Sequence, residues 1–252
     1  MTDAGRIRIA ALGDLHVPKA PSAVLQPLFA HAAQNADVLL LCGDLTDHGL
    51  EDEARVLVKE LAAVMKTPVI AVLGNHDYEA GKAETVVAIL KEAGVQMLDG
   101  DSVEIAGVGF AGVKGFAGGF GERALQPWGE PSIKAFVHEA VGEALKLETA
   151  LAKLRTALRV ALLHYSPIHV TLEGEPAEIY PFLGSSRLEE PLTRYPVAAV
   201  FHGHAHRGRL EGRTRDGAPV YNVSLPLLLQ HAEPDRSALR IVELALPAAQ
   251  AA

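Results

Sequence analysis

The chain has 252 residues, a formal net charge of −8 and a single cysteine, Cys42. The acidic excess argues against broad electrostatic binding to nucleic acid or anionic membranes, and one cysteine excludes an internal disulfide. No stretch near the N-terminus resembles a signal peptide or is long enough to span a bilayer, so we expect a cytoplasmic protein with no membrane partner. With 49% apolar residues, the chain has enough material for one large α/β core.

The first part of the chain alternates between predicted strands and predicted helices. Apolar runs that end in glycine and polar residues are typical of buried parallel strands, here IRIAAL (7–12), DVLLLCGD (37–44) and PVIAVLGNHD (68–77). Helical periodicity follows each of them, at about 22–35, 51–65 and 82–93. This order is typical of an α/β fold.

The second part contains more strands and two irregular loops. A hairpin is expected at 102–113, helices at about 132–158 and 185–194, buried strands in RVALLHYSP (159–167) and PVAAVFHGHAH (196–206), and strands over 208–246 around the turn Asp216-Gly217. No flexible linker interrupts the chain, which predicts a single domain over 1–252 with a Gly- and aromatic-rich loop at 114–131 and an irregular loop at 165–184.

The 114–131 loop and the long helix each allow two interpretations. Phe116, Phe120 and Trp128 either form a mobile lid or stacking surface, or pack onto the sheet as ordinary loop aromatics. The apolar stripe of the helix at 132–158 favours core packing, with a helix-mediated homodimer as the alternative.

Five predicted strands end in residues that carry chemistry. The motifs are GDLH (13–16), GDLTD (43–47), GNHD (74–77), LLHYSP (162–167) and FHGHAH (201–206). Taken alone, each has a structural explanation: Asp14 suits a turn, Asn75 and Asp77 suit helix caps, and a lone His164 suits a strand end. Together they place acidic and imidazole groups at the sheet edge where ligands bind in α/β proteins, and a metal cluster would offset the cost of burying them.

The donor types indicate which metals would bind. Carboxylate, imidazole and amide oxygen donors suit Mn, Fe and Zn, and the lack of thiolates argues against a closed structural zinc site. Seven candidate donors are too many for one ion and suit two ions that share a carboxylate, an arrangement that clamps phosphoryl groups. The candidates are Asp14, His16, Asp44, Asn75, His164, His204 and His206.

The five motifs, in this order over residues 13–206, resemble those of the calcineurin-like metallophosphoesterases, and most nearly the class III cyclic-nucleotide phosphodiesterases. The resemblance implies a layered α-β-β-α sandwich of two mixed sheets flanked by helices. It also implies two metal ions (Mn, Fe or Zn) that share Asp44. One ion would be bound by Asp14, His16, Asp44 and His206, and the other by Asp44, Asn75, His164 and His204.

The resemblance further implies a mechanism in which a metal-bridging hydroxide attacks phosphorus. His76 would protonate the leaving oxygen, and Asp47 would be its carboxylate partner. His202 has no role in the family pattern, so we expect it to be structural or to support a ligand. Asp77 is not expected to be a ligand.

Two departures from the family pattern narrow the expected activity. The Ser/Thr protein phosphatases of the superfamily carry Arg where this chain has His48, and the lipid-A-pathway pyrophosphatases carry Arg where it has His76. We therefore expect hydrolysis of a phosphodiester of a nucleotide or other small molecule. A phosphomonoesterase or nuclease of the same superfamily is the alternative, and a non-catalytic metal-dependent scaffold is the alternative from a different class.

Overall fold

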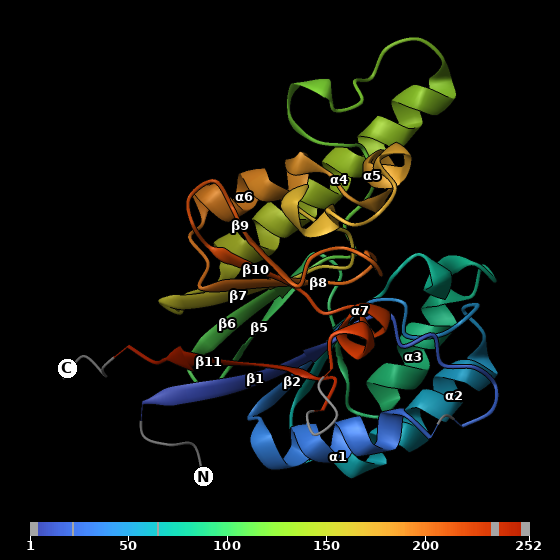
Figure 1. The fold of residues 1–252 in the computed structure, drawn as a ribbon, viewed down its shortest axis with the longest axis vertical. Coiled ribbons are helices and arrows are strands. Elements are labelled where there is room, and N and C mark those ends of the chain that lie inside the picture. The colour runs from blue at the N-terminus through green and yellow to red at the C-terminus, as the bar shows by residue number, and fades with distance from the viewer. Residues whose placement is uncertain (1–4, 22, 65, 233–236, 248–252) are drawn as a thin grey trace.

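Two mixed β-sheets lie one above the other at the centre of the molecule (Figure 1). The computed structural model describes residues 5–21, 23–64, 66–232 and 237–247. In the first sheet four strands run parallel and β11 is antiparallel to β1. Every residue of β2 is buried, as its continuous apolar sequence predicts for a parallel strand covered on both faces. The strands in spatial order are β11 (Arg240–Ala245), β1 (Arg6–Leu12), β2 (Val38–Cys42), β3 (Val69–Val72) and β4 (Gln96–Met97).

The second sheet has a parallel centre and an antiparallel strand at each edge. Its strands in spatial order are β5 (Asp101–Ile105), β6 (Val108–Gly112), β7 (Leu158–Leu162), β8 (Ala199–His202), β10 (Pro219–Asn222) and β9 (Glu211–Arg213). The predicted hairpin is confirmed as β5 and β6. Ala106 and Gly107 join these strands with φ angles of 51° and 81°, the left-handed backbone that tight hairpin turns require.

Helices cover the outer faces of both sheets. Figure 1 shows α1, α2 and α3 on the side of the first sheet and α4, α5 and α6 on the side of the second. This confirms the expected α-β-β-α layering of two mixed sheets. The α-helices are α1 (Leu25–Asn35), α2 (Glu51–Glu60), α3 (Ala83–Glu92), α4 (Pro131–Lys153), α5 (Tyr180–Leu183), α6 (Glu189–Arg194) and α7 (Leu225–Gln230). Short 3₁₀ helices are η1 (Leu61–Val64), η2 (His76–Tyr78), η3 (Gly121–Arg123), η4 (Val170–Leu172), η5 (Ala177–Ile179) and η6 (Ser186–Leu188).

The long helix ends earlier than its sequence pattern predicts. The apolar spacing continues to Leu154, but α4 stops at Lys153, and Leu158 already pairs with Val108 in the second sheet. A strand must be extended to make these hydrogen bonds, so sheet pairing overrides the helical period. The sequence pattern also misses α7 and β4, because a short apolar run has no period that separates helix from strand.

The aromatic residues of the 114–131 loop differ in their surroundings. Phe116 packs against Phe136 and Tyr165, with ring centroids 4.9 and 5.9 Å away, as expected for an ordinary loop aromatic. Trp128 is 66% exposed. The loop is therefore anchored at one end and leaves a large apolar side chain in solvent at the other.

No helix in the described part of the chain has both the length and the apolar character needed to cross a membrane.

Candidate metal centre

Five strands from the two sheets bring their carboxyl ends to one place. Strands β1, β2 and β3 are parallel neighbours in the first sheet, and β7 and β8 are parallel neighbours in the second. Backbone hydrogen bonds link the two sheets here, since Gly13 N donates to Val223 O at 2.8 Å. The side chains that gather are Asp14 and His16 after β1, Asp44 after β2, Asn75 and His76 after β3, His164 after β7, and His204 and His206 after β8.

Four of these residues have a left-handed backbone. The φ angles are 54° for Asp14, 42° for His16, 46° for Asp44 and 70° for His204. Among the described residues, Ala106 of the hairpin turn is the one other non-glycine with positive φ. This conformation costs energy for residues with a Cβ and tends to occur at functional sites, where it aims a side chain that a relaxed backbone would direct elsewhere.

Asp14, His16 and His206 form one group of donors. One ligand atom from each lies within 4.8 Å of the others, and His206 Nε2 lies 3.1 Å from Asp14 Oδ1. His16 Nε2 is buried and has no hydrogen-bond partner among the described residues. A buried ring nitrogen without a partner is costly, so this atom marks a position where a further ligand is needed.

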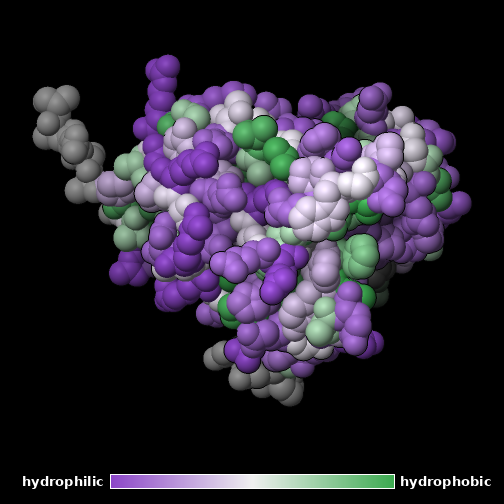
Figure 2. Space-filling view, turned by 90° about the horizontal axis from the view of Figure 1, so that it is seen from above, coloured by the Kyte–Doolittle hydropathy of each residue, from purple (hydrophilic) through white to green (hydrophobic). Residues whose placement is uncertain are grey.

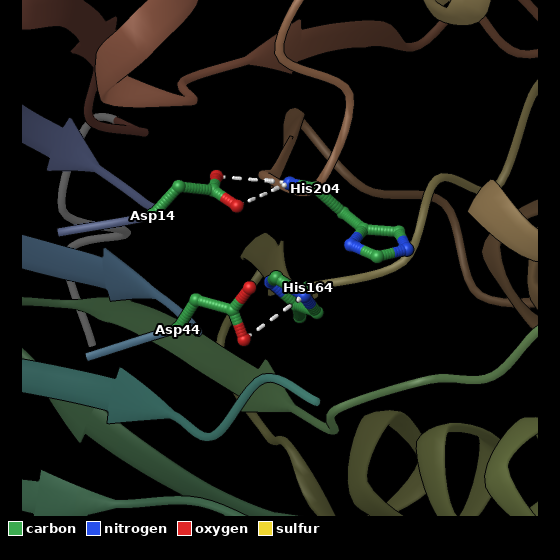
Figure 3. Close-up of side chains that lie close together, drawn as sticks. All are labelled: Asp14, Asp44, His164 and His204. Atoms are coloured by element: carbon green, nitrogen blue, oxygen red, sulfur yellow. Dashed lines mark hydrogen bonds and ion pairs between the residues drawn. The ribbon is translucent and has the colours of Figure 1, made fainter. Parts of the chain in front are cut away.

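Asp14, Asp44, His164 and His204 form a second group, again with ligand atoms within 4.8 Å. Figure 3 shows the two carboxylates side by side at the ends of neighbouring strands, with the histidines across from them. The amide oxygen of Asn75 joins this group because it lies 2.9 Å from His164 Nε2. The predicted ligands after β2, β3, β7 and β8 are thus close together.

Asp14 belongs to both groups, and the carboxylate of Asp44, a member of the second group, also faces the first. Asp44 Oδ2 is 3.8 Å from His16 Nε2, and Asp44 Oδ1 is 3.5 Å from His164 Nε2. The backbone N–H of His76 donates to Oδ1 at 2.9 Å and fixes the carboxylate in this orientation. One oxygen therefore faces each group of imidazoles.

The local electrostatics favour the metal-binding protonation state of Asp14, His16 and His204. Burial lowers the pKa of His204 to about 3, and burial also lowers the pKa of His16, so both rings are neutral at pH 7. Burial acts to raise the pKa of Asp14, but the hydrogen bond from His206 and the neighbouring histidines outweigh it and hold that pKa below its usual range. The same hydrogen bond raises the pKa of His206. Neutral imidazole and ionised carboxylate are the ligand forms.

Glycine is required at two places where the ligands meet the backbone. A Cβ on Gly74 would lie 2.1 Å from Asp44 Oδ1, and a Cβ on Gly203 would lie 2.4 Å from Asp14 Oδ2. Real side chains do not approach so closely, so only glycine allows these carboxylates to reach the centre. The glycines of GNHD and FHGHAH therefore serve ligand placement.

Asp77 links the loop after β2 to the loop after β3 through hydrogen bonds. Its buried carboxylate accepts hydrogen bonds from the backbone N–H groups of Leu45, Thr46 and Gly74 and from the hydroxyl of Thr46, at 2.6 to 3.1 Å. All four of these hydrogen bonds serve the main chain and the hydroxyl group of the two loops. The loop after β2 and the loop after β3 are thereby held in fixed relation.

His202 lies apart from its two neighbours in the FHGHAH motif. It is fully buried, and its ring nitrogens contact Gly203 O at 2.8 Å and Thr171 Oγ1 at 2.9 Å. Burial lowers its pKa to about 4, so the ring is neutral. This agrees with a structural role, in contrast to His204 and His206, which lie in separate donor groups.

The contact between His76 and Asp47 differs from the expected one. His76 Nδ1 lies 2.7 Å from the backbone carbonyl oxygen of Asp47, whereas the Asp47 carboxylate turns toward His16 and His48, at 3.7 and 3.4 Å. A carboxylate oxygen of Asp47 and a ring nitrogen of His76 still lie within 4.8 Å of each other, so the carboxylate partnership stays a prediction, while the hydrogen bond itself goes to the main chain. The carboxylate of Glu79 lies 3.8 Å from the same nitrogen.

A family model for calcineurin-like phosphoesterases matches residues 7–208, a range that contains all five motifs. The chain belongs to this family. It is accordingly a metal-dependent phosphoester hydrolase, and the expected family is confirmed.

Solved structures with the same fold are similar to this phosphoesterase at low sequence identity. Phosphopantetheinyl hydrolase from Mycobacterium tuberculosis is 20% identical, with a TM-score of 0.64 and 97% of each chain covered. The protein TT1561 of Thermus thermophilus is 17% identical, with a TM-score of 0.52, 86% of this chain and 88% of that chain covered. Purple acid phosphatase PPD1 from yellow lupin seeds is 13% identical, with a TM-score of 0.52, and this chain spans 38% of its length and is itself 80% covered. No curated protein sequence matches the chain.

The geometry of the candidate ligands is by itself suited to binding metal ions. The unpartnered His16 Nε2, the buried carboxylates of Asp14 and Asp44 and the strained backbone at four of the candidate ligands all lie at one site. Oxygen and imidazole donors without thiolates suit divalent transition metals, whose identity the donor types leave open among Mn, Fe and Zn.

Two residues at the centre escape prediction from the sequence. The ring of Tyr165 lies 4.5 Å from that of His204, and Phe182 places its carbonyl oxygen 3.3 Å from His204 Nε2. Tyr165 directly follows a predicted ligand, which is a usable signal. Phe182 has none, because it lies in α5, a helix of four residues that carries no motif.

Proposed function

We propose that this phosphoesterase hydrolyses phosphodiesters of small organic molecules at a centre of two transition-metal ions. The observation that carries the proposal is the position of Asp44, whose two carboxylate oxygens face imidazoles of different donor groups, His16 on one side and His164 on the other. A carboxylate in this position is suited to being shared by two ions.

Each ion has its own set of ligands in this proposal. By the family resemblance, Asp14, His16, Asp44 and His206 would hold one, and Asp44, Asn75, His164 and His204 would hold the other. The donor atoms of these residues lie close together, with Asp14 in both donor groups. When bound, the two ions supply Lewis-acid activation of water and offset the negative charge that develops on the phosphate. The residues themselves fix the donor positions before substrate arrives, through the hydrogen bonds of Asp77 and the left-handed backbone at Asp14 and Asp44.

His76 is the proposed proton donor to the leaving oxygen. A carbonyl oxygen can only accept a hydrogen bond, so the contact with Asp47 O fixes the hydrogen of His76 on Nδ1. Nε2 is then the nitrogen that exchanges a proton with substrate. The ring lies against His16, with centroids 4.5 Å apart, so it stands at the edge of the centre.

A diester is favoured over a phosphorylated protein as substrate. His48, which is 55% exposed, stands where the Ser/Thr protein phosphatases have the arginine expected to grip a phosphate, and its ring is paired with Glu79 at 2.9 Å. The similarity to class III phosphodiesterase motifs supports the same preference. The M. tuberculosis relative, named for hydrolysis of a phosphopantetheinyl group, also supports an organic phosphoester as substrate.

The test is hydrolysis of bis-p-nitrophenyl phosphate and of p-nitrophenyl phosphate by protein stripped with a chelator and reloaded with Mn, Fe, Zn or Mg. We expect turnover of the diester to exceed that of the monoester and to require reloading, with two ions per chain by mass spectrometry. Faster turnover of the monoester would contradict the diester preference. One ion per chain at full activity would contradict the shared role of Asp44.

A further inference from the structure

A large cavity opens beside the metal centre, at the end of the molecule formed by α4 and α5. It has a volume of about 950 Å³ and lies between the 114–131 loop, the start of α4 and residues 177–182. Its wall includes the side chains of Phe120, Leu125, Ile133, Phe136, Tyr180 and Phe182. Figure 2, seen from above relative to Figure 1, shows green hydrophobic residues among mostly purple ones on this face. The cavity is of the size that takes a small organic ligand.

Phe182 connects the cavity to the donor groups. Its side chain lines the wall and is 59% exposed, while its carbonyl oxygen lies 3.3 Å from Nε2 of His204. The ring of Phe120, on the opposite loop, lies 6.4 Å from the ring of His169 and is tilted by 56° against it. A molecule whose phosphate sits at the metal centre therefore has the cavity as the neighbouring space for its organic part.

The wall is built before any ligand binds. Gly118 N donates to Pro181 O at 2.7 Å and Gly119 N donates to Gly184 O at 3.0 Å, so main-chain hydrogen bonds join the two loops. Arg187 Nη2 donates to Leu125 O at 2.9 Å and fixes the far side of the 114–131 loop. These bonds fix the backbone of the two loops that carry the aromatic side chains, which reduces the entropy lost on binding.

The chemistry of the wall selects among organic groups. Its polar side chains are those of Arg123, Ser132 and His169 and the hydroxyl of Tyr180; the other lining residues are apolar or glycine. A nucleobase has several donors and acceptors along its edge, and most would be left unpaired against such a wall, at a cost in binding. An alkyl or aryl group has no such groups and gains from every apolar contact.

We propose that this cavity binds an alkyl or aryl ester group of the substrate, so that the enzyme acts on phosphodiesters with an apolar organic part in preference to nucleotides. The inference rests on the proposed phosphodiesterase function of the neighbouring metal centre. In the test reaction water adds to phosphorus, the bond to the aryl oxygen breaks, p-nitrophenolate leaves and the alkyl phosphate remains. The alkyl chain occupies the cavity throughout.

The experiment is a series of p-nitrophenyl alkyl phosphodiesters from methyl to octyl, compared with the p-nitrophenyl ester of thymidine 5′-phosphate. We expect kcat/KM to rise about fourfold for each added methylene until the cavity is filled, the factor that corresponds to burial of one CH₂. The thymidine ester should be turned over more slowly than the octyl ester. A flat dependence on chain length, or a preference for the thymidine ester, would overturn the proposal and leave the phosphodiesterase function standing.

Direct binding measurements distinguish an error in the proposal for the cavity from an error in the proposed function. If no diester is hydrolysed with any metal, the proposed function is wrong, and calorimetry with octyl phosphate and methyl phosphate still tests the cavity. Tighter binding of octyl phosphate, by about tenfold or more, would support an apolar site. Equal binding of the two would refute it.

A substitution in the cavity wall tests whether the dependence of kcat/KM on chain length arises in this cavity. Ile133→Glu places a charge in the wall and should reduce the octyl-to-methyl ratio of kcat/KM to near one. Leu145→Glu is the matched control, because Leu145 lies on the same helix, is 56% exposed and does not line the cavity. An unchanged ratio in a folded Ile133→Glu variant would contradict the proposal. If that variant fails to fold by thermal melting, Ile133→Ala should still lower the ratio severalfold, and no change there would count equally against the proposal.

Discussion

The metal centre and the apolar cavity beside it are built in opposite ways. The metal centre uses short loops directly after buried strands, with a left-handed backbone at four candidate ligands and a buried carboxylate, Asp77, that binds the loops after β2 and β3 together. The cavity uses two long loops and the start of a helix, and its wall is mostly apolar with the exposed side chain of Phe182 at one edge.

This difference indicates that the metal centre determines the reaction, whereas the cavity determines which substrates are preferred. Atoms that bind metal must be fixed to within a few tenths of an ångström, which short loops and buried hydrogen bonds provide. A wall that accepts an organic group needs only shape and apolar surface, and long loops supply these without disturbing the strands. Changes at the centre should therefore abolish turnover for every substrate, whereas changes in the cavity should alter preference.

The largest effect is expected for Asp44→Asn. Removal of the charge that faces both donor groups should release both metal ions and lower kcat by about 10³-fold or more for every ester, because several kcal/mol of charge stabilisation are lost. Metal content by mass spectrometry, measured with kcat, checks this. Asp216→Asn is the control, since Asn-Gly keeps the turn that Asp-Gly forms. Loss of a single ion would mean that Asp44 is not shared.

The three histidines of FHGHAH should fall into two classes. His204→Ala and His206→Ala should each reduce the metal content from two ions to about one and lower kcat by roughly 10²-fold, since each lies in a different donor group. His202→Ala should keep both ions and lower the free energy of unfolding by about 1–3 kcal/mol through its lost buried hydrogen bonds. Metal analysis and urea denaturation distinguish these outcomes. Metal loss in His202→Ala would contradict its structural role.

His76→Ala should slow the reaction without emptying the centre. General-acid groups typically contribute about 10²-fold or more, so kcat should fall by that amount while two ions stay bound. The loss should shrink for esters with better leaving groups, which need less protonation. His138→Ala, at an exposed position on α4, is the control. A fall in metal content would show that His76 is a ligand and would contradict the proposed role.

Asp77→Asn tests the rigidity of the metal-centre loops. The amide cannot accept all four hydrogen bonds that the carboxylate accepts, so buried N–H groups lose their partner. We expect a loss of about 3 kcal/mol in the free energy of unfolding of metal-free protein, measured in urea. An unchanged midpoint would mean that the loops are held by other contacts.

The smallest effect is expected for Trp128→Ala. Trp128 is 66% exposed and does not line the cavity, so neither metal content nor the octyl-to-methyl ratio should change by more than about twofold. Steady-state kinetics with the two esters measures this ratio. A large fall would indicate that the 114–131 loop closes over substrate as a lid, one of its two interpretations from the sequence.

Much of the fold is predictable because its strands are apolar runs with polar ends. The strands β1, β2, β3, β7 and β8, the β5–β6 hairpin and the helix α3 all lie where the sequence pattern places them. The errors in the predicted elements lie where the local sequence contains no signal that would end a helix or distinguish a helix from a strand. The stripe of α4 continues to Leu154 although the chain must already be extended to join β7, and the apolar run of α7 has too few residues to show a period.

The sequence by itself determined which side chains stand at the carboxyl edge of each sheet, and the packing of the two sheets brought these edges together. Each candidate ligand directly follows an apolar strand, and parallel strands must end on the same side of a sheet. The need for glycine at Gly74 and Gly203 was not readable in this way, because a Cβ there would meet Asp44 and Asp14, which lie far away in the chain.

Only the tertiary structure decided that Asp14 belongs to both donor groups, that His76 makes its hydrogen bond with the carbonyl oxygen of Asp47, and that an apolar cavity adjoins the centre. These features depend on contacts between loops far apart in the chain. Loops have no period and no fixed direction, so their paths follow from hydrogen bonds such as Gly118 N to Pro181 O, which no local pattern encodes.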